Sequence, residues 1–186
     1  MTARNFWINQ AFFQASWPAC VIGAGNGLIW PALAVVGAFL LWQLAPARAH
    51  PADRATVGLF VLTGLVLDTL WQQLGIVEYA LAWPAAGVSP IWLLLLWAAL
   101  GLTVHHSLAL FKRRWVLFML LTMVGSPLSY SAAAAFGAVT WTAPGWLVVL
   151  CMGPVWAVIV GALFWNASRP ERDPAPADRN LEGARG

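Results

Sequence analysis

The distribution of positive charge is the feature that most restricts how this chain can fold. Six apolar stretches follow one another along the sequence, at residues 5–25, 28–44, 55–75, 91–111, 115–136 and 146–166. Every lysine and arginine precedes the first stretch, follows the last, or lies in the second or fourth connection (Arg4, Arg48, Arg54, Lys112, Arg113, Arg114, Arg169, Arg172, Arg179 and Arg185). Loops on the cytoplasmic side of a membrane carry such an excess. The sequence therefore predicts an all-α polytopic membrane bundle of six transmembrane helices with both termini in the cytoplasm.

Composition supports a membrane location. Only 9% of the 186 residues are charged and 61% are hydrophobic, which leaves too little charge to cover a soluble domain of this length. We expect a six-helix transmembrane domain over residues 1–167, with membrane lipids around it. Residues 168–186 have almost nothing to bury and predict a disordered cytoplasmic tail.

Asp68 is the acidic residue that we expect at membrane depth. It lies in the segment LTGLVLDTLWQQLG. A carboxylate in hydrocarbon normally faces other helices or a cavity and marks a functional site. Helical spacing places Gly64, Trp71 and Gln72 on the same face as this carboxylate. Asp68 is therefore a candidate acid or base, and Trp71 and Gln72 are candidate ligand contacts.

The first apolar stretch begins with several amide side chains. Gln10 and Gln14 are four residues apart and therefore share a helix face. Such amides either bond to a neighbouring helix or line a cavity. We keep both interpretations and include the two glutamines among the candidate ligand contacts.

A proline interrupts the fifth stretch. Pro127 should kink the helix and free a backbone carbonyl. Ser126, Ser129 and Tyr130 lie beside it in the sequence GSPLSY. Counted at about 1.5 Å per residue, these three side chains fall at the depth of Asp68. We predict that they are its neighbours and contact a ligand.

Two adjacent histidines end the fourth stretch. Neighbouring residues on a helix point about 100° apart, so only one of the two faces an interior site. We expect His105 to be the interior one, because Gly101 opens that face one turn earlier, and His106 to extend toward the surface. His105 is the second acid or base candidate, at a depth about 10 Å from Asp68 and out of contact with it.

No metal site, cofactor or nucleic-acid interface is predicted. Metal ligands on a helix stand three or four residues apart, and neither histidine of the pair has such a partner. The basic residues form no recognition stripe. The sequence also contains no nucleotide-binding loop and no nucleophile elbow.

Small residues recur at every fourth position in the last two stretches. They are Gly125, Ser129, Ala133 and Gly137 in the fifth stretch, and Gly153, Ala157 and Gly161 in the sixth. Such faces let helices approach closely. We expect them to act as packing surfaces, and they offer a site for a second copy of the chain or for a membrane-protein partner.

Thirteen tryptophans are present, and most lie near the ends of the apolar stretches. That position is typical of anchors at the membrane interface. Trp17, Trp97 and Trp156 lie nearer the middle of their stretches. We expect them to pack between helices and to be the first side chains that an apolar ligand meets.

Five segments resemble the DUF2878 family of bacterial inner-membrane proteins: NFWINQAFFQASW, LDTLWQQLGI, SPIWLLLLW, HSL of the fourth stretch and GSPLSY of the fifth. The resemblance covers most of residues 5–166. It implies a small multi-pass protein of the bacterial inner (plasma) membrane. It supplies no assigned reaction, catalytic residue or cofactor.

Three kinds of function fit these residues, and we prefer them in this order. The first is binding or modification of a small lipid-soluble molecule in an intramembrane pocket, with Asp68 and His105 as acid or base groups. The second is a proton- or cation-coupled transporter that acts as a homodimer through Asp68. The third is a structural or assembly subunit that holds a partner through the small-residue faces. The sequence leaves the ligand and the oligomeric state open.

Overall fold

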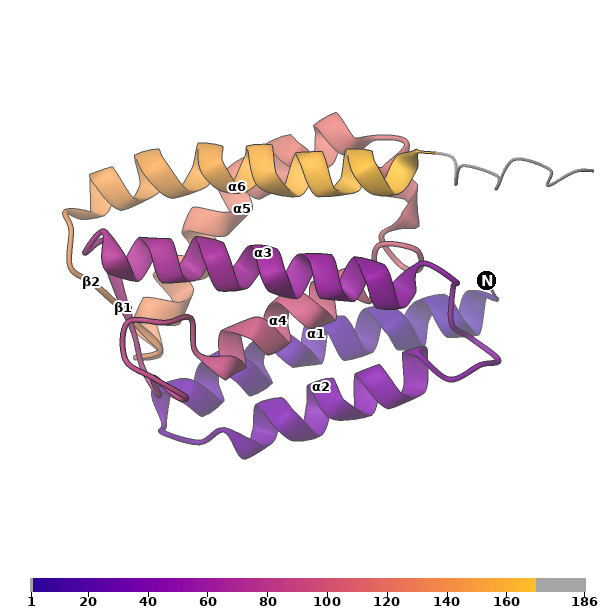
Figure 1. The fold of residues 1–186 in the computed structure, drawn as a ribbon, viewed down its shortest axis with the longest axis horizontal. Coiled ribbons are helices and arrows are strands. Elements are labelled where there is room, and N and C mark those ends of the chain that lie inside the picture. Colours follow the sequence, from indigo (N-terminus) through magenta and orange to yellow (C-terminus); the bar gives the residue numbers. More distant parts are fainter. Residues whose placement is uncertain (1, 170–186) are drawn as a thin grey trace, which may run out of the picture.

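The computed structural model describes residues 2–169, and this range contains six α-helices, a 3-10 helix and two short strands. The helices are α1 (Ala3–Gly25), α2 (Trp30–Gln43), α3 (Asp53–Gln73), α4 (Ile91–Gly101), α5 (Trp115–Ala135) and α6 (Gly145–Ser168). The 3-10 helix η1 (Ala109–Lys112) precedes α5, and the strands are β1 (Val77–Tyr79) and β2 (Val139–Trp141). Successive helices run in opposite directions within one bundle (Figure 1). Most of the predicted tail, residues 170–186, lies outside the described range.

Local sequence explains where several helices start and stop. The side chain of Thr2 caps α1 by accepting a hydrogen bond from the backbone of Asn5. Pro31 lies in the first turn of α2, where its missing N–H costs nothing. Gly25 ends α1 against the end of α5, and a Cβ there would lie only 1.9 Å from the carbonyl oxygen of Phe136. This close approach requires glycine.

The basic residues gather at one end of the bundle. This end holds the start of α1, the end of α2, the start of α3, η1 and the end of α6 (Figure 1). Every lysine and arginine among residues 2–169 lies in or next to one of these segments. The two strands lie at the opposite end. We call the first of these the basic end.

Three helices, α3, α5 and α6, are long and apolar enough to cross a membrane, with 21, 21 and 24 residues. Helices α2 and α4 are apolar but have only 14 and 11 residues, fewer than the roughly 20 that a bilayer core requires. Helix α1 has 23 residues, but its amides reduce its apolar character. The described chain is thus mostly helical with three candidate spans, where the sequence predicted six.

The fourth apolar stretch is not one continuous helix. We predicted residues 91–111, but α4 ends at Gly101 and a series of turns leads to η1. In these turns the carbonyl of Leu102 accepts a hydrogen bond from Asn9 of α1. Backbone hydrogen bonds within the turns, together with this bond from Asn9, therefore replace the next helical turns.

The two connections opposite the basic end pair with each other. Strands β1 and β2 are antiparallel, with Glu78 opposite Thr140 at the centre of the register. Val77 and Tyr79 are buried, whereas Glu78 is exposed. The purely helical prediction missed this small sheet, which brings Tyr79 back toward the helices.

The small residues of α6 pack against α5 of the same chain. A Cβ on Gly153 would lie 2.6 Å from the carbonyl oxygen of Met123, and one on Gly161 would lie 3.2 Å from the Met119 side chain. Since Pro127 has no N–H to donate to Met123, this contact lies at the carbonyl that the proline leaves free. Gly125 of α5 instead faces open space.

Large apolar side chains cover much of the outer surface. Leu41 on α2, Val66 on α3 and Leu150 on α6 are 81%, 69% and 65% exposed. Soluble monomers rarely leave such surface in contact with water. Lipid contact accounts for these exposed side chains, in agreement with the three candidate spans.

Candidate functional site

Asp68 is completely buried and accepts hydrogen bonds from three other elements. Trp97 of α4 donates to Oδ2 at 2.7 Å, and Tyr130 of α5 donates to Oδ1 at 2.7 Å. Tyr79 of β1 also donates to Oδ1, at 3.1 Å. Hydrogen bonds to an ionised group are each worth about 1.5–3 kcal/mol. The carboxylate therefore holds α3, α4, α5 and the sheet together.

Gly64 allows Trp97 to reach this carboxylate. It lies one helical turn before Asp68 on α3, and a Cβ at this position would lie 2.1 Å from Cδ1 of Trp97. The predicted face of α3 therefore does contact another helix. The indole occupies the space that any larger residue at position 64 would fill.

A cavity of about 450 Å³ lies beside this cluster, between α1, α4, α5 and α6. Binding sites for small molecules commonly have about 300–1,000 Å³. Its walls are mostly apolar or aromatic (Phe13, Trp17, Leu93, Leu96, Trp97, Leu100, Leu108, Phe118, Leu121, Gly125 and Trp156). Its polar lining residues are Gln10, Gln14, Thr122, Ser126, Ser129 and Tyr130. We call it the tryptophan-lined cavity.

The three tryptophans singled out from the sequence all line this cavity. The rings of Trp97 and Trp156 stack with their centroids 4.5 Å apart and an interplanar angle of 15°. Trp17 donates a hydrogen bond of 2.9 Å from its indole to the hydroxyl of Ser129. The cavity therefore has flat, fixed aromatic walls.

Two polar groups in the wall lack a hydrogen-bond partner within residues 2–169. They are the buried hydroxyl of Ser126 and the indole N–H of Trp156. Buried polar groups are almost always paired, and an exception calls for an explanation such as a ligand. Both residues line the cavity, so a molecule bound there would lie next to these two groups.

The cavity opens at the outer surface of the bundle. Three residues line the cavity and are also exposed at the surface: Gln14 of α1, and Leu121 and Gly125 of α5. Because α5 is a candidate membrane span, this opening faces the region that lipid would occupy.

Five of the predicted ligand contacts line the cavity, and two do not. The five are Gln10, Gln14, Ser126, Ser129 and Tyr130. Trp71 is buried in the hydrophobic core, and Gln72, the next residue, is partly buried and does not line the cavity. Asp68 lies behind the wall formed by Trp97 and Tyr130. The face of α3 that we predicted is therefore covered by neighbouring helices.

The expected neighbours of Asp68 are only partly its partners. Tyr130 bonds to the carboxylate, whereas Ser126 and Ser129 do not. The sequence analysis missed Tyr79 and Trp97 as donors to Asp68. Trp97 had a signal, its position in the middle of an apolar stretch. Tyr79 had none, because only strand pairing brings it to the site.

A comparison with protein families agrees with the motifs of the sequence. The model of the family described as "Protein of unknown function (DUF2878)" matches residues 6–162. The chain belongs to the DUF2878 family. No curated protein and no solved structure matches it. The matched region of this DUF2878 chain includes the whole tryptophan-lined cavity and its Asp68 cluster.

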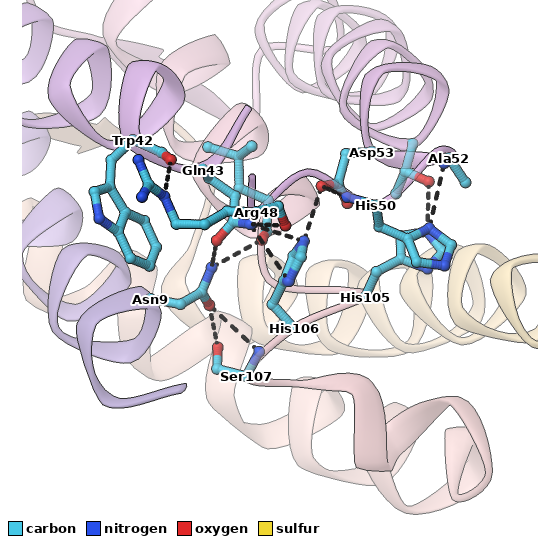
Figure 2. Close-up of polar contacts among 12 residues, drawn as sticks. Asn9, Trp42, Gln43, Arg48, His50, Ala52, Asp53, His105, His106 and Ser107 are labelled. Carbon is cyan, nitrogen blue, oxygen red and sulfur yellow. Dashed lines mark hydrogen bonds and ion pairs between the residues drawn. The ribbon is translucent and has the colours of Figure 1, made fainter. Parts of the chain in front are cut away.

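A second polar cluster connects four elements near the basic end of the DUF2878 chain (Figure 2). His106 lies 2.8 Å from Oδ2 of Asp53 at the start of α3, and 3.0 Å from the amide nitrogen of Gln43 at the end of α2. Asn9 of α1 donates to Gln43 at 2.7 Å and accepts from Ser107 at 2.6 Å. All five side chains are buried. The cluster connects α1, α2 and α3 to the turns that follow α4.

The two histidines exchange the roles that we predicted. His106 is the interior one, with 8% of its side chain exposed, and His105 is only partly buried. The prediction was wrong because it assumed a helix through residue 106, whereas α4 ends at Gly101. Gly101 instead lets α3 pack closely against α4, since a Cβ there would lie 3.0 Å from Cα of Val57.

The hydrogen-bond partners of His105 are different from those of Asp68. One ring nitrogen is 2.9 Å from the hydroxyl of Thr56, and the other is 3.1 Å from the ammonium of Lys112. Burial, followed by the charge of Lys112, lowers the pKa of His105 to about 4. His105 is therefore neutral near pH 7.

Proposed function

We propose that this DUF2878 protein binds a small, uncharged, lipid-soluble molecule in the tryptophan-lined cavity. The observation that carries the proposal is the Ser126 hydroxyl, which is buried in a mostly apolar wall with no hydrogen-bond partner among the described residues. A ligand with one hydrogen-bonding group would satisfy it. The rest of the ligand would bury apolar surface against the aromatic walls.

The charge of the lining favours a neutral ligand. Among the described residues that line the cavity, Tyr130 alone has an ionisable side chain, and its O–H is already donated to Asp68. A charged ligand would therefore enter a low-dielectric site without a counterion, at a cost of several kilocalories per mole. The flat stack of Trp97 and Trp156 suits a planar or extended apolar skeleton.

We further propose a bacterial inner-membrane location, with all six helices crossing and both termini in the cytoplasm. The alternation of helix direction and the gathering of basic residues at one end support this topology (Figure 1). Helices α2 and α4 are short for a span. A short apolar helix is accommodated by local thinning of the bilayer.

The other two functions receive less support. A carrier site for a proton or cation at Asp68 would need free oxygen ligands, but Trp97, Tyr79 and Tyr130 already donate to both of its oxygens. An assembly role through the small residues of α6 would need an open face. Gly153 and Gly161 are covered by α5 of the same chain.

Gly125→Leu tests the proposal without disturbing the fold. A Cβ on Gly125 meets nothing within 4 Å, and the residue lines the cavity, so leucine would fill the entrance rather than clash. The protein would be purified from native membranes and its solvent extract analysed by mass spectrometry. We expect the wild type to retain a lipophilic compound in roughly stoichiometric amount and Gly125→Leu to lose most of it.

Gly37→Leu is the matched control, because a Cβ on Gly37 of α2 also meets nothing within 4 Å and the residue lies away from the cavity. It should retain the compound like the wild type. Equal extracts from Gly125→Leu and the wild type, with both proteins folded, would exclude the cavity as the binding site.

A further inference from the structure

A second cavity, of about 550 Å³, lies at the basic end between the start of α3 and the end of α6. Its polar lining residues are His50, Thr56, His105, Lys112, Asn166, Ser168 and Arg169. Ala52, Ala55, Leu59 and Ala167 complete the wall. Two of these residues are cationic and none is acidic. We call it the basic-end pocket.

Two stacked imidazoles form one wall of the basic-end pocket (Figure 2). The rings of His50 and His105 have centroids 4.3 Å apart and an interplanar angle of 4°. Both come from turns, one before α3 and the other after α4. Their hydrogen bonds determine what each ring presents to the pocket.

In both imidazoles, the ring nitrogen that carries a lone pair already accepts a hydrogen bond. An ammonium can only donate, so the contact of Lys112 with Nδ1 of His105 at 3.1 Å makes this nitrogen the acceptor. Nε2 of His105 then carries the proton and donates to Thr56 at 2.9 Å. In the same way, the backbone N–H of Ala52 donates to Nδ1 of His50 at 3.2 Å. Nε2 of His50 consequently carries a proton.

This pattern disfavours a metal cation. His50, Asp53 and His105 have ligand atoms within 4.8 Å of one another, and Oδ1 of Asp53 lacks a hydrogen-bond partner among residues 2–169. A cation would nevertheless have to displace the donors on both imidazoles. It would also lie close to the ammonium of Lys112, and the two positive charges would repel each other.

We propose that the basic-end pocket binds a phosphate group. Lys112 supplies a fixed positive charge, and Arg169 supplies a guanidinium that recognises phosphate oxygens in pairs. The Nε2–H of His50 adds a neutral donor.

Two sources can supply this phosphate. Leu59 of α3 and Ala167 of α6 give the pocket an apolar side, and both helices are candidate membrane spans. An anionic phospholipid would place its phosphate among the donors and its acyl chains along these helices. A soluble phosphate ester would use the same donors without the apolar side. This inference is independent of the tryptophan-lined cavity.

Native mass spectrometry of the detergent-purified protein tests the proposal with three probes: phosphatidylglycerol, diacylglycerol and glycerol 3-phosphate. We expect phosphatidylglycerol to bind and diacylglycerol, which lacks the phosphate, to bind about tenfold more weakly. Binding of glycerol 3-phosphate with similar strength would support a soluble ligand, whereas its failure beside bound phosphatidylglycerol would support a lipid. Equal binding of the two lipids would overturn the proposal.

Lys112→Gln should weaken phosphatidylglycerol binding about tenfold. Arg113→Gln removes one charge from the next residue, which is exposed and does not line the pocket, and should change binding less than about twofold. If Lys112→Gln fails to fold, Arg169→Gln at the exposed end of α6 takes its place. If the pocket variant and Arg113→Gln weaken phosphatidylglycerol binding equally, the effect comes from net charge and not from the pocket. Tight Zn²⁺ binding that requires His50 and His105 would also refute the phosphate site.

Discussion

The indole nitrogen of Trp97 lies 2.7 Å from Oδ2 of Asp68, across the contact between α4 and α3. Gly64 leaves the space for this indole. A face of the same indole stacks on Trp156, and both tryptophans line the tryptophan-lined cavity. The buried carboxylate therefore positions a cavity wall without facing the cavity. This makes Asp68 a positioning residue in the proposed binding site.

Asp68→Asn and Asp68→Leu should have different effects on stability. An asparagine oxygen can still accept from Trp97, and the hydroxyls of Tyr79 and Tyr130 can rotate to accept from its NH₂ group. We expect Asp68→Asn to lose about 1–2 kcal/mol of unfolding free energy. Leucine leaves three buried donors without an acceptor and should cost at least about 3 kcal/mol. Unfolding in mixed micelles, followed by circular dichroism, measures both; equal losses would contradict this role.

Gly64→Ala should destabilise the protein and shift the fluorescence of Trp97. Its methyl group would overlap the indole ring, so Trp97 would have to leave Asp68. We expect a loss of about 2–3 kcal/mol, typical of overpacking. The control is Gly58→Ala on the same helix, where a Cβ meets nothing within 4 Å. It should be neutral or stabilising by up to about 1 kcal/mol, because alanine favours helix.

His106→Ala and His105→Ala compare neighbours that lie in different environments. Removing His106 takes one buried partner from Asp53 and one from Gln43, which should cost about 3 kcal/mol or more. Removing His105 breaks contacts with Thr56 and Lys112 at a partly exposed site and should cost about 1 kcal/mol. The unfolding free energies of the two variants show which histidine contributes more to stability. A larger effect at His105 would restore the original assignment of the interior histidine.

The pKa of His105 predicts how stability depends on pH. The fold lowers it from the ordinary 6.5 to about 4, so the folded protein binds fewer protons than the unfolded chain between these values. The stabilising contribution is therefore complete above pH 6.5 and decreases as the pH falls toward 4. Over this interval the melting temperature of the wild type should fall more than that of His105→Asn, which cannot titrate. If the melting temperatures of the two proteins fall equally over this pH interval, His105 does not contribute to the pH dependence of stability.

Reporter fusions test the proposed topology. With six crossings, a reporter inserted near Ala85, in the connection after β1, should be periplasmic. A reporter fused after Arg185 should be cytoplasmic, because the basic connections mark that side. Activity of both reporters in the same compartment would rule out the three crossings that the six-span topology places between them.

The membrane class and the positions of the helices could be predicted from the sequence. Hydropathy and charge are properties of consecutive residues, so they locate α3, α5 and α6 to within two residues of the predicted ranges. The same patterns identified Trp17, Trp97, Trp156 and five polar residues that line the cavity, because polar or aromatic residues inside an apolar stretch must face other helices.

Only the tertiary structure decided which groups meet. Tyr79 reaches Asp68 because β1 pairs with β2, a contact between segments about sixty residues apart in the sequence. His106 became the buried histidine because α4 stops at Gly101 and its helical spacing no longer applies. The basic-end pocket joins residues from two connections, the start of α3 and the end of α6. Pairings of this kind depend on where distant segments pack, and local sequence patterns do not determine this packing.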